Sequence, residues 1–179
     1  MNVEIRKATA ADLEAVARIY DHIHTEEEQG RVQIGWRRGV YPVRSTAEAA
    51  LKRAELFVEE ADGRVVGTAI LNQEQVAVYA GAAWQYAAPK EQVMVMHTLV
   101  IDPEEGQKGL GSAFAAFYEQ YAREHGCPYL RIDTNARNET ARAFYRKLGY
   151  REAGVVPCVF NGLKDVRLVL LEKKLDEQR

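Results

Sequence analysis

The chain has 179 residues, of which 47% are hydrophobic and 28% are charged, a balance that is ordinary for a globular protein with one sizeable core. Its 24 lysine and arginine residues face 26 aspartate and glutamate residues, so a net charge of -2 gives no general attraction to nucleic acid or to an anionic membrane. No apolar run approaches the roughly 20 residues that a membrane span requires. We therefore expect one cytoplasmic domain over residues 1–179.

The cysteines and histidines form no metal-binding motif. Cys127 and Cys158 lie far apart, and neither belongs to a CxxC pair, which favours plain thiols in a reducing compartment. His22 and His24 are two residues apart on a predicted helix, so they point to different faces. We therefore expect no metal ion.

The N-terminal part begins with a strand and a helix. Residues 3–7 have the pattern of a short strand, and Thr9 with Asp12 resembles a capping box ahead of an amphipathic helix. Residues 25–44 are interrupted by glycine and proline and carry bulky aromatic side chains. We interpret this irregular stretch as a loop on the substrate side.

A second helix and a hairpin follow. Ser45 and Glu48 indicate another capping box, and the strands predicted over 56–60 and 64–71 flank an Asp-Gly turn. Residues 72–92 are polar and rich in alanine, and they are too long for a typical loop. Two assignments remain open for this segment, an extension of the hairpin or a short helix.

Residues 93–101 are apolar on both alternating faces, apart from His97 and Thr98, as in a strand buried at the centre of a sheet. A stretch with three glycines, 106–111, leads into a helix that ends near Gly126. The order of buried strand, glycine loop and helix is the strongest local signal in the sequence.

In the C-terminal part, the sequence pattern predicts a strand, a helix and a final pair of strands. After the strand at 129–134, Asn138 is a natural N-cap for a helix that stops at Gly149. The last two strands are expected at 152–160 and 166–172, around an Asn-Gly turn.

Glycines between a strand and a helix allow backbone amides to approach an anion, and the helix N-terminus adds about half a positive charge. The spacing in this chain matches neither the dinucleotide motif GxGxxG nor the Walker motif. Gly109 and Gly111 instead match the last two positions of the loop Arg/Gln-x-x-Gly-x-Gly/Ala, and this stretch resembles motif A of the GNAT superfamily of N-acetyltransferases. Gly106 departs from the pattern, which has arginine or glutamine there.

A second motif supports the resemblance. Residues 138–150, Asn-Glu-Thr-Ala-Arg-Ala-Phe-Tyr-Arg-Lys-Leu-Gly-Tyr, are similar to motif B of the same superfamily. The resemblance covers residues 93–151 and implies an α/β (α+β) fold. In that fold a mixed, mostly antiparallel curved sheet is flanked by helices, and acyl-CoA binds where two central strands separate. It also implies acetyl-CoA as co-substrate.

The resemblance assigns roles to individual residues. Leu99, Val100 and Ile101 would present backbone groups to the pantetheine arm, and Asn138 would hydrogen-bond the cofactor. Tyr145 would protonate the leaving thiolate, and it too would contact the cofactor. The pyrophosphate would be held by the loop residues Gln107, Lys108, Gly109, Leu110, Gly111 and Ser112.

A general base has two candidates, because an amine with a pKa near 10 must lose a proton before it attacks. Asp133 ends a strand where some family members carry a carboxylate base, although an ion pair with Arg131 or Arg137 is an alternative role. His97 lies beside the expected cofactor site, where a buried structural histidine is the alternative. A water relay could also remove this proton.

The resemblance places four aromatic residues where the superfamily shapes its acceptor pocket: Trp36, Tyr41, Trp84 and Tyr86. We predict an N-acetyltransferase that acts on a primary amine of a small molecule by direct attack, since neither motif contains a cysteine. One alternative is a protein N-terminal or lysine acetyltransferase, and another is an acyl-CoA-binding module without turnover. A homodimer through the late strands is compatible with the sequence.

Overall fold

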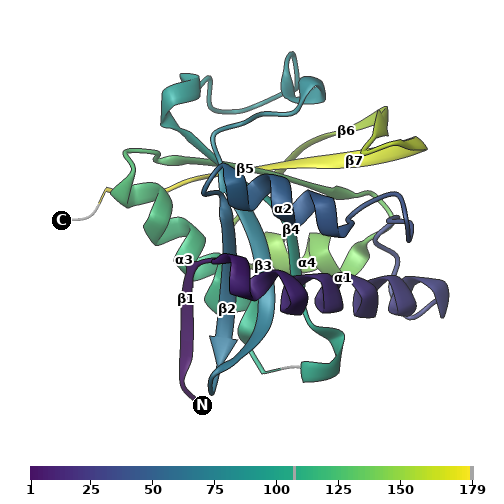
Figure 1. Cartoon of the computed structure of the whole chain (residues 1–179). Helices are drawn as coiled ribbons and strands as arrows, with labels where there is room; N and C mark the ends of the chain where they lie inside the picture. Colours follow the sequence, from purple (N-terminus) through teal and green to yellow (C-terminus); the bar gives the residue numbers. More distant parts are fainter. Residues whose placement is uncertain (107, 178–179) are drawn as a thin grey trace. The chain divides into compact units, whose positions relative to one another are not determined.

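The computed structural model describes residues 1–106 and 108–177. Its seven strands form one sheet in the order β1-β2-β3-β4-β5-β7-β6 (Figure 1). The strands are β1 (Val3–Lys7), β2 (Leu56–Ala61), β3 (Arg64–Asn72), β4 (Val93–Ile101), β5 (Tyr129–Asn135), β6 (Arg151–Phe160) and β7 (Leu163–Lys174). The α-helices of the described residues are α1 (Leu13–Glu28), α2 (Arg44–Lys52), α3 (Leu110–Glu124) and α4 (Glu139–Lys147).

The pairing of the strands confirms the predicted mixed, mostly antiparallel sheet. β1 with β2, β2 with β3, β5 with β7 and β6 with β7 are antiparallel, whereas β4 and β5 are parallel. The register of β4 on β5 runs from Val93 opposite Tyr129 to Val95 opposite Arg131, although both strands continue further.

The chain forms two compact units. The first comprises Met1–Val32, Trp36–Leu71 and Met96–Tyr118. The second comprises Gln33–Gly35, Asn72–Val95 and Glu119–Arg179. β4 and α3 contribute residues to both units, and the expectation of a single domain stays a prediction. No helix among the described residues has the length and apolar character needed to cross a membrane.

In the first unit, the helix predicted after the capping box is present. Asp12 accepts the backbone N–H of Thr9 at 2.7 Å, as a capping box requires. Val16, Ile19 and Ile23 are buried at helical spacing along α1, which packs against α2. The apolar stripe therefore explains both the helix and the face that it buries.

The helix α3 begins on an apolar cluster of the same unit. Leu110 packs with Ala61 and Val66 from the strands. About two helical turns later the Phe117 ring lies 5.6 Å from the ring of Phe57. These contacts fix the N-terminus of α3 against β2 and β3, directly after the glycine loop.

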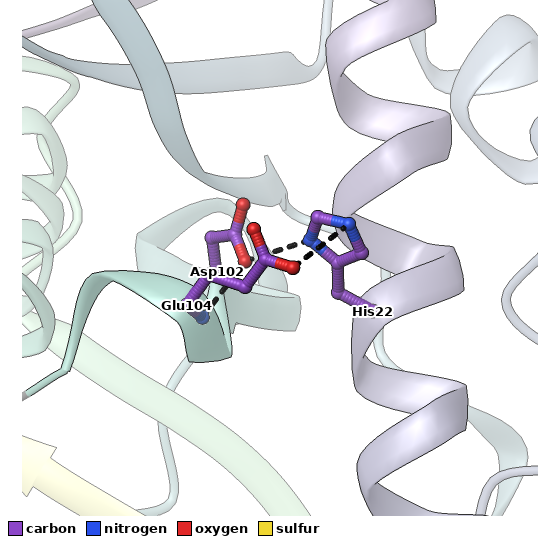
Figure 2. Close-up of side chains that lie close together, drawn as sticks. All are labelled: His22, Asp102 and Glu104. Carbon is purple, nitrogen blue, oxygen red and sulfur yellow. Dashed lines mark hydrogen bonds and ion pairs between the residues drawn. The ribbon is translucent and has the colours of Figure 1, made fainter.

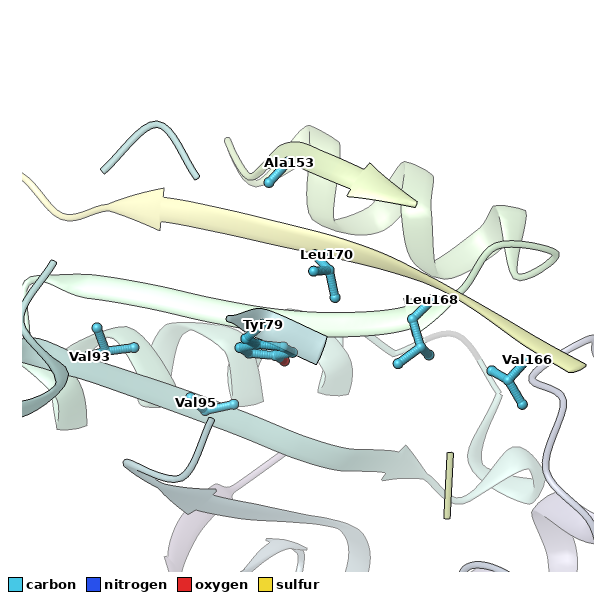
Figure 3. Packing of buried hydrophobic residues seen from close by; sticks show 7 residues of the cluster. All are labelled: Tyr79, Val93, Val95, Ala153, Val166, Leu168 and Leu170. Carbon is cyan, nitrogen blue, oxygen red and sulfur yellow. The ribbon is translucent and has the colours of Figure 1, made fainter. Parts of the chain in front are cut away.

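The second unit has its own core, shown in Figure 3. Tyr79 lies among aliphatic side chains of β4 and β7, including Val95, Leu168 and Leu170, and only 1% of it is exposed. The residues 72–92 thus contribute a buried aromatic ring to this core.

Two sequence predictions need correction. The second helix does not begin with Ser45 as its cap, because α2 starts at Arg44 and the hydroxyl of Thr46 accepts the N–H of Val43 at 3.0 Å. Residues 72–92 form no hairpin extension. They contain two single 3₁₀ turns, η2 (Ala77–Tyr79) and η3 (Lys90–Gln92), so the short-helix alternative was the nearer one.

Candidate active site

Along β4 the side chains change from buried to half-buried at His97, Thr98 and Leu99. The four residues before them are buried, whereas these three in succession are half-buried. Thr98 has a φ of 52°, a left-handed conformation that a β-branched residue rarely adopts. Its hydroxyl shares a hydrogen bond with the phenol of Tyr41. The backbone is therefore irregular beside the residues expected to contact pantetheine.

Trp36 and Tyr41 lie together in the first unit, with ring centroids 6.1 Å apart in an edge-to-face arrangement. Tyr41 is also the hydrogen-bond partner of Thr98 on β4. The structure thus brings two of the four predicted acceptor-side aromatics to the irregular part of β4.

The glycine loop has the backbone that anion binding needs. Gly109 has a φ of 74°, and a Cβ at this position would meet no atom within 4 Å. The carbonyl of Gly109 accepts the N–H of Ala113 at 3.0 Å, so the earlier amides of α3, from Leu110 to Ser112, have no partner within the helix. These residues fit a pyrophosphate at the N-terminus of a 15-residue helix.

Charged side chains precede this loop. Glu105 is buried and pairs with Arg64 at 2.8 Å and with Lys108 at 3.4 Å. Lys108, one of the predicted pyrophosphate ligands, is therefore already beside a carboxylate. Gln107, another of them, lies outside the described residues.

Three side chains link the segment after β4 to α1: His22, Asp102 and Glu104 (Figure 2). Oδ1 of Asp102 accepts the N–H of Glu104 at 3.0 Å and lies 2.9 Å from Nδ1 of His22. Nε2 of the same histidine is 3.6 Å from Glu104 Oε1. One ligand atom from each residue lies within 4.8 Å of the others, so the group could hold a divalent ion. Hydrogen bonds and ion pairs within the group already account for its geometry.

His24 lies elsewhere, with its Nε2 bonded to the carbonyl of Pro42 at 2.8 Å. The spacing of His22 and His24 alone excluded a metal pair, but the partner of His22 is Asp102, which is 80 residues away in the chain and shares no local motif with it.

In the second unit, Asp133 extends from β5 and is half-buried. Its Oδ2 accepts the hydroxyl of Tyr79 at 2.7 Å. Burial raises the pKa of Asp133 to about 6, and the bond from Tyr79 opposes that rise. Among the described residues its partner is therefore a phenol, not Arg131 or Arg137 as the alternative reading proposed.

Tyr145 lies in the same unit on α4 and is 8% exposed. Its ring packs edge-on against Phe144 and Tyr150, with centroids 5.1 and 5.4 Å away. Burial, and then the negative charge of Asp133, raise the pKa of Tyr145 well above its usual value. The phenol therefore keeps its proton at neutral pH, which is compatible with the proton-donor role that the resemblance predicts.

Asn138 is the N-cap of α4, as predicted. Its Oδ1 accepts the backbone N–H of Ala141 at 3.1 Å. This bond orients the side chain that motif B assigns to the cofactor.

Trp84 and Tyr86 help to hold residues 72–92 on the sheet. The indole N–H of Trp84 donates to the carbonyl of Tyr79 at 2.8 Å, and its ring lies 4.2 Å from the guanidinium of Arg131. The Tyr86 ring lies 5.8 Å from the ring of Tyr129. Both aromatics, predicted as acceptor contacts, therefore also have packing roles.

Two charged residues of the sheet complete this attachment, and sequence reasoning had missed one of them. Glu172 is 2% exposed and accepts the backbone N–H groups of Gln85 and Tyr86 at 2.8 and 3.1 Å. Arg131 donates to the carbonyl of Tyr86 at 2.8 Å and to the side chain of Gln75 at 2.7 Å. Nothing in the local sequence around Glu172 distinguishes it from a solvated strand residue.

A model of the acetyltransferase (GNAT) family matches residues 15–150, which is more than half of the chain. The chain therefore belongs to the GNAT family of acetyltransferases, a family of acyl-transferring enzymes. The matched range contains the glycine loop, Asp133, Asn138 and Tyr145. The resemblance found in the two motifs is thus confirmed.

One relative by sequence is "Uncharacterized N-acetyltransferase MJ1207" of Methanocaldococcus jannaschii, which is 29% identical over 108 residues. The alignment covers 59% of this chain and 44% of that relative, so the chain matches less than half of the relative's length.

Solved structures share the fold. A GNAT-family acetyltransferase from Streptococcus agalactiae has a TM-score of 0.80 and 21% identity, over 98% of this chain and 96% of that chain. YncA of Salmonella typhimurium, in a structure with its cofactor acetyl-CoA, has a TM-score of 0.70 and 19% identity, over 100% and 97% of the two chains. These similarities confirm the predicted fold.

Proposed function

We propose that this chain moves an acetyl group from acetyl-CoA to a primary amine of a small molecule by direct attack. The proposal is carried by two groups of the second unit: the half-buried carboxyl of Asp133 on β5, which accepts the hydroxyl of Tyr79, and the buried phenol of Tyr145 on α4. The negative charge of Asp133 also raises the pKa of Tyr145, in addition to the effect of burial. Direct transfer to an amine involves one proton acceptor and one proton donor, and these two side chains can fill both roles.

We assign the contacts with acetyl-CoA to the same residues that the two motifs indicate. Leu99, Val100 and Ile101 offer backbone groups to pantetheine, and Asn138 offers its amide. The pyrophosphate would be bound by the loop residues Gln107, Lys108, Gly109, Leu110, Gly111 and Ser112. Support for this loop comes from the left-handed Gly109 with open space beside it and from the amides of the first turn of α3.

When bound, the thioester supplies an activated acetyl carbon with a thiolate as leaving group. The amine nitrogen forms a bond to that carbon while the carbon–sulfur bond breaks. Tyr145 gives its proton to the sulfur, and the proton lost by nitrogen goes to Asp133. His97, the second candidate base, is half-buried on the irregular part of β4.

A small acceptor is favoured by the way residues 72–92 are fastened in the second unit. Tyr79, Trp84 and Tyr86 all bond or pack onto β5 and its neighbours, so this segment is not a free arm for holding a folded protein. Acetylation of a protein N-terminus or lysine is the alternative. A module that only binds acyl-CoA would have no use for a protonated Tyr145.

We propose that the acetyl transfer requires no metal ion and that the protein is cytoplasmic. Cys127 and Cys158 are free thiols, which are typical of a reducing compartment. Acetyl transfer is therefore expected to persist in excess EDTA. A loss of activity that zinc restores would instead assign a metal to His22, Asp102 and Glu104.

We also propose a homodimer through the late strands. β6 is an edge strand of the sheet, and its Val155 and Val159 are 41% and 69% exposed. Val159→Lys should lower the mass measured by light scattering after gel filtration from two chains to one. A monomeric wild-type protein would contradict the dimer.

The binding step is tested by calorimetry with acetyl-CoA. Gly109→Trp should abolish binding, because the indole fills the space beside the loop. Gly126→Trp is the matched control, since Gly126 also has a positive φ and open space but lies at the other end of α3. Absence of wild-type binding, or equal loss in both variants, would overturn the assignment of the loop.

The transfer step is tested by release of coenzyme A thiol with a panel of amines. The panel contains tyramine, an amino-acid amide, kanamycin, a peptide with a free N-terminus and an N-blocked peptide with one lysine. Acetylation of one of the first three supports a small acceptor. Acetylation of the peptides alone supports the alternative, and binding without any turnover supports the non-catalytic module.

A further inference from the structure

Tyr79 is a buried phenol that neither family motif contains. It lies in the 3₁₀ turn η2, is 1% exposed, and packs among Val95, Leu168 and Leu170 (Figure 3). The phenolic oxygen is the polar end of this otherwise apolar ring. It donates to Oδ2 of Asp133 at 2.7 Å, across 54 residues of sequence.

The surroundings fix the position of this phenol. The N–H of Tyr79 donates to the carbonyl of Val76 at 2.9 Å, and its own carbonyl accepts the indole N–H of Trp84 at 2.8 Å. The Tyr79 and Trp84 rings meet edge-to-face at 5.4 Å. Trp84 is in turn held over Arg131. The hydroxyl is therefore presented to Asp133 by a rigid support.

The other titratable groups around Asp133 come from three directions. Tyr145 on α4 and Cys158 on β6 both feel its negative charge, which raises their pKa values in addition to the effect of burial. Arg131, two residues earlier on β5, bonds to Gln75 and to the carbonyl of Tyr86. Among the described residues, Tyr79 is thus the group that donates a hydrogen bond to this carboxylate.

We infer that Tyr79 is a positioning residue for Asp133: its hydroxyl holds Oδ2 of the carboxylate and leaves Oδ1 as the oxygen that takes the proton of the attacking amine. The inference rests on the proposed function, in which Asp133 is the base. Tyr79 keeps its own proton throughout. The proton moves from nitrogen to Oδ1 as the nitrogen–carbon bond forms, and the sulfur that leaves takes the proton of Tyr145.

The hydrogen bond from Tyr79 also favours the ionised form of Asp133, because it lowers the pKa of the carboxyl against the effect of burial. A base must be ionised before it can accept a proton. Loss of the hydroxyl should therefore raise the pKa of Asp133 and leave less of the carboxylate ionised just above pH 6.

The test is Tyr79→Phe, which removes the hydroxyl and keeps the buried ring. With the best amine of the panel above, we expect the acid limb of the kcat/KM profile to move to higher pH and kcat to fall by about tenfold, the size of one lost hydrogen bond to a charged group. The KM for acetyl-CoA should not change. An acid limb that stays in place would overturn the inference.

A second measurement does not depend on turnover. The ¹³Cγ resonance of Asp133, identified by its absence in Asp133→Asn, should titrate near pH 6 in the wild-type protein and at higher pH in Tyr79→Phe. Tyr129→Phe is the matched control, because Tyr129 lies on the same face of β5 and no hydroxyl bond to Asp133 is lost. An unchanged titration in Tyr79→Phe, with a melting temperature near that of the wild type, would refute the coupling.

The two measurements separate the inference from the function on which it rests. A wild-type protein that acetylates no amine of the panel contradicts the proposed function, whatever the carboxyl titration shows. An active enzyme whose acid limb and Asp133 titration both ignore Tyr79→Phe contradicts the positioning role alone.

Discussion

Asp133 and Glu59 are two carboxyl groups that burial perturbs in the same direction, one in each compact unit of the chain. Burial raises the pKa of Asp133 to about 6 and that of Glu59 to about 7. Asp133 is half-buried and accepts the hydroxyl of Tyr79. Glu59 on β2 is completely buried, and neither of its oxygens has a hydrogen-bond partner among the described residues.

The difference lies in what surrounds each carboxyl. Glu59 is on the same face of β2 as Phe57 and Ala61, which contact α3 and its apolar cluster. Its Oε2 lies close to Gly67, beside the side chain of Ile101. An ionised carboxylate gains nothing there in return for its lost hydration, whereas Asp133 gains a donor and remains partly accessible. Under the proposed mechanism, the same rise in pKa therefore gives a base in one unit, whereas in the other it is a cost in stability.

The sharpest test of this contrast is to neutralise each carboxyl in turn. Asp133→Asn should lower kcat about 100-fold or more, the usual contribution of a general base, while the protein stays folded. Glu59→Gln should leave kcat within about twofold. Release of coenzyme A thiol measures both, and equal kcat values in Asp133→Asn and the wild type would transfer the role of the base to His97 or to water.

Tyr145→Phe tests the other partner of Asp133. It should lower kcat about 100-fold without weakening acetyl-CoA binding, because the ring remains and only the donated proton is lost. The alkaline limb of the rate profile should also disappear, since the pKa of Tyr145 is raised and its ionisation limits activity only at high pH. Full activity in the variant would show that solvent protonates the thiolate.

The sequence predicted some of these residues and missed others for identifiable reasons. Gly109 and Asn138 belong to contiguous motifs whose spacing already specifies a loop and a helix cap, and the structure has both. Tyr79 sits in a segment without periodicity, and its partner is 54 residues away, so no local pattern connects the two. Its role depends on tertiary contacts that a single sequence does not show.

Glu59 was missed for a different reason. A glutamate in a strand normally indicates the solvent face, but β2 is buried on both faces from Leu56 to Glu59. Periodicity predicted the strand itself at 56–60, and the structure extends it by one residue to Ala61. The positions of strands and helices followed from hydrophobic pattern, whereas the burial of a charge depended on which elements cover the sheet.

The pH dependence of stability provides the next test. Because burial raises the pKa of Glu59 to about 7, the folded protein holds this proton up to about pH 7, whereas the unfolded chain releases it near the ordinary glutamate pKa of 4.5. The contribution of Glu59 to stability is therefore complete below pH 4.5, is lost between pH 4.5 and 7, and stays lost above pH 7. We expect this loss to be about 3 kcal/mol at most.

Glu59→Gln removes this titration. The difference in the free energy of unfolding between wild type and variant, from urea denaturation at several pH values, should change in favour of the variant as pH rises from 4.5 to 7. A difference that is independent of pH would mean that Glu59 is paired or hydrated in solution, and the contrast with Asp133 would then disappear.

The smallest expected effect concerns how tightly Glu59 is enclosed. A Cβ at Gly67 would lie 2.8 Å from Cδ1 of Ile101 and 3.0 Å from Oε2 of Glu59, so both side chains must shift in Gly67→Ala. Overpacking of this kind costs about 1–3 kcal/mol.

Crowding is the cause of the expected loss, because Gly67 has no positive φ that an alanine would strain. Gly63→Ala would be a poor control, because Gly63 does have a positive φ. Combining Gly67→Ala with Ile101→Val should recover part of the lost stability, because the shorter side chain removes the Cδ1 contact and leaves those with Glu59 Oε2 and, at 3.4 Å, the carbonyl of Val100. If Gly67→Ala is neutral, the carboxyl has room to move toward a partner, and it is then as well accommodated as Asp133.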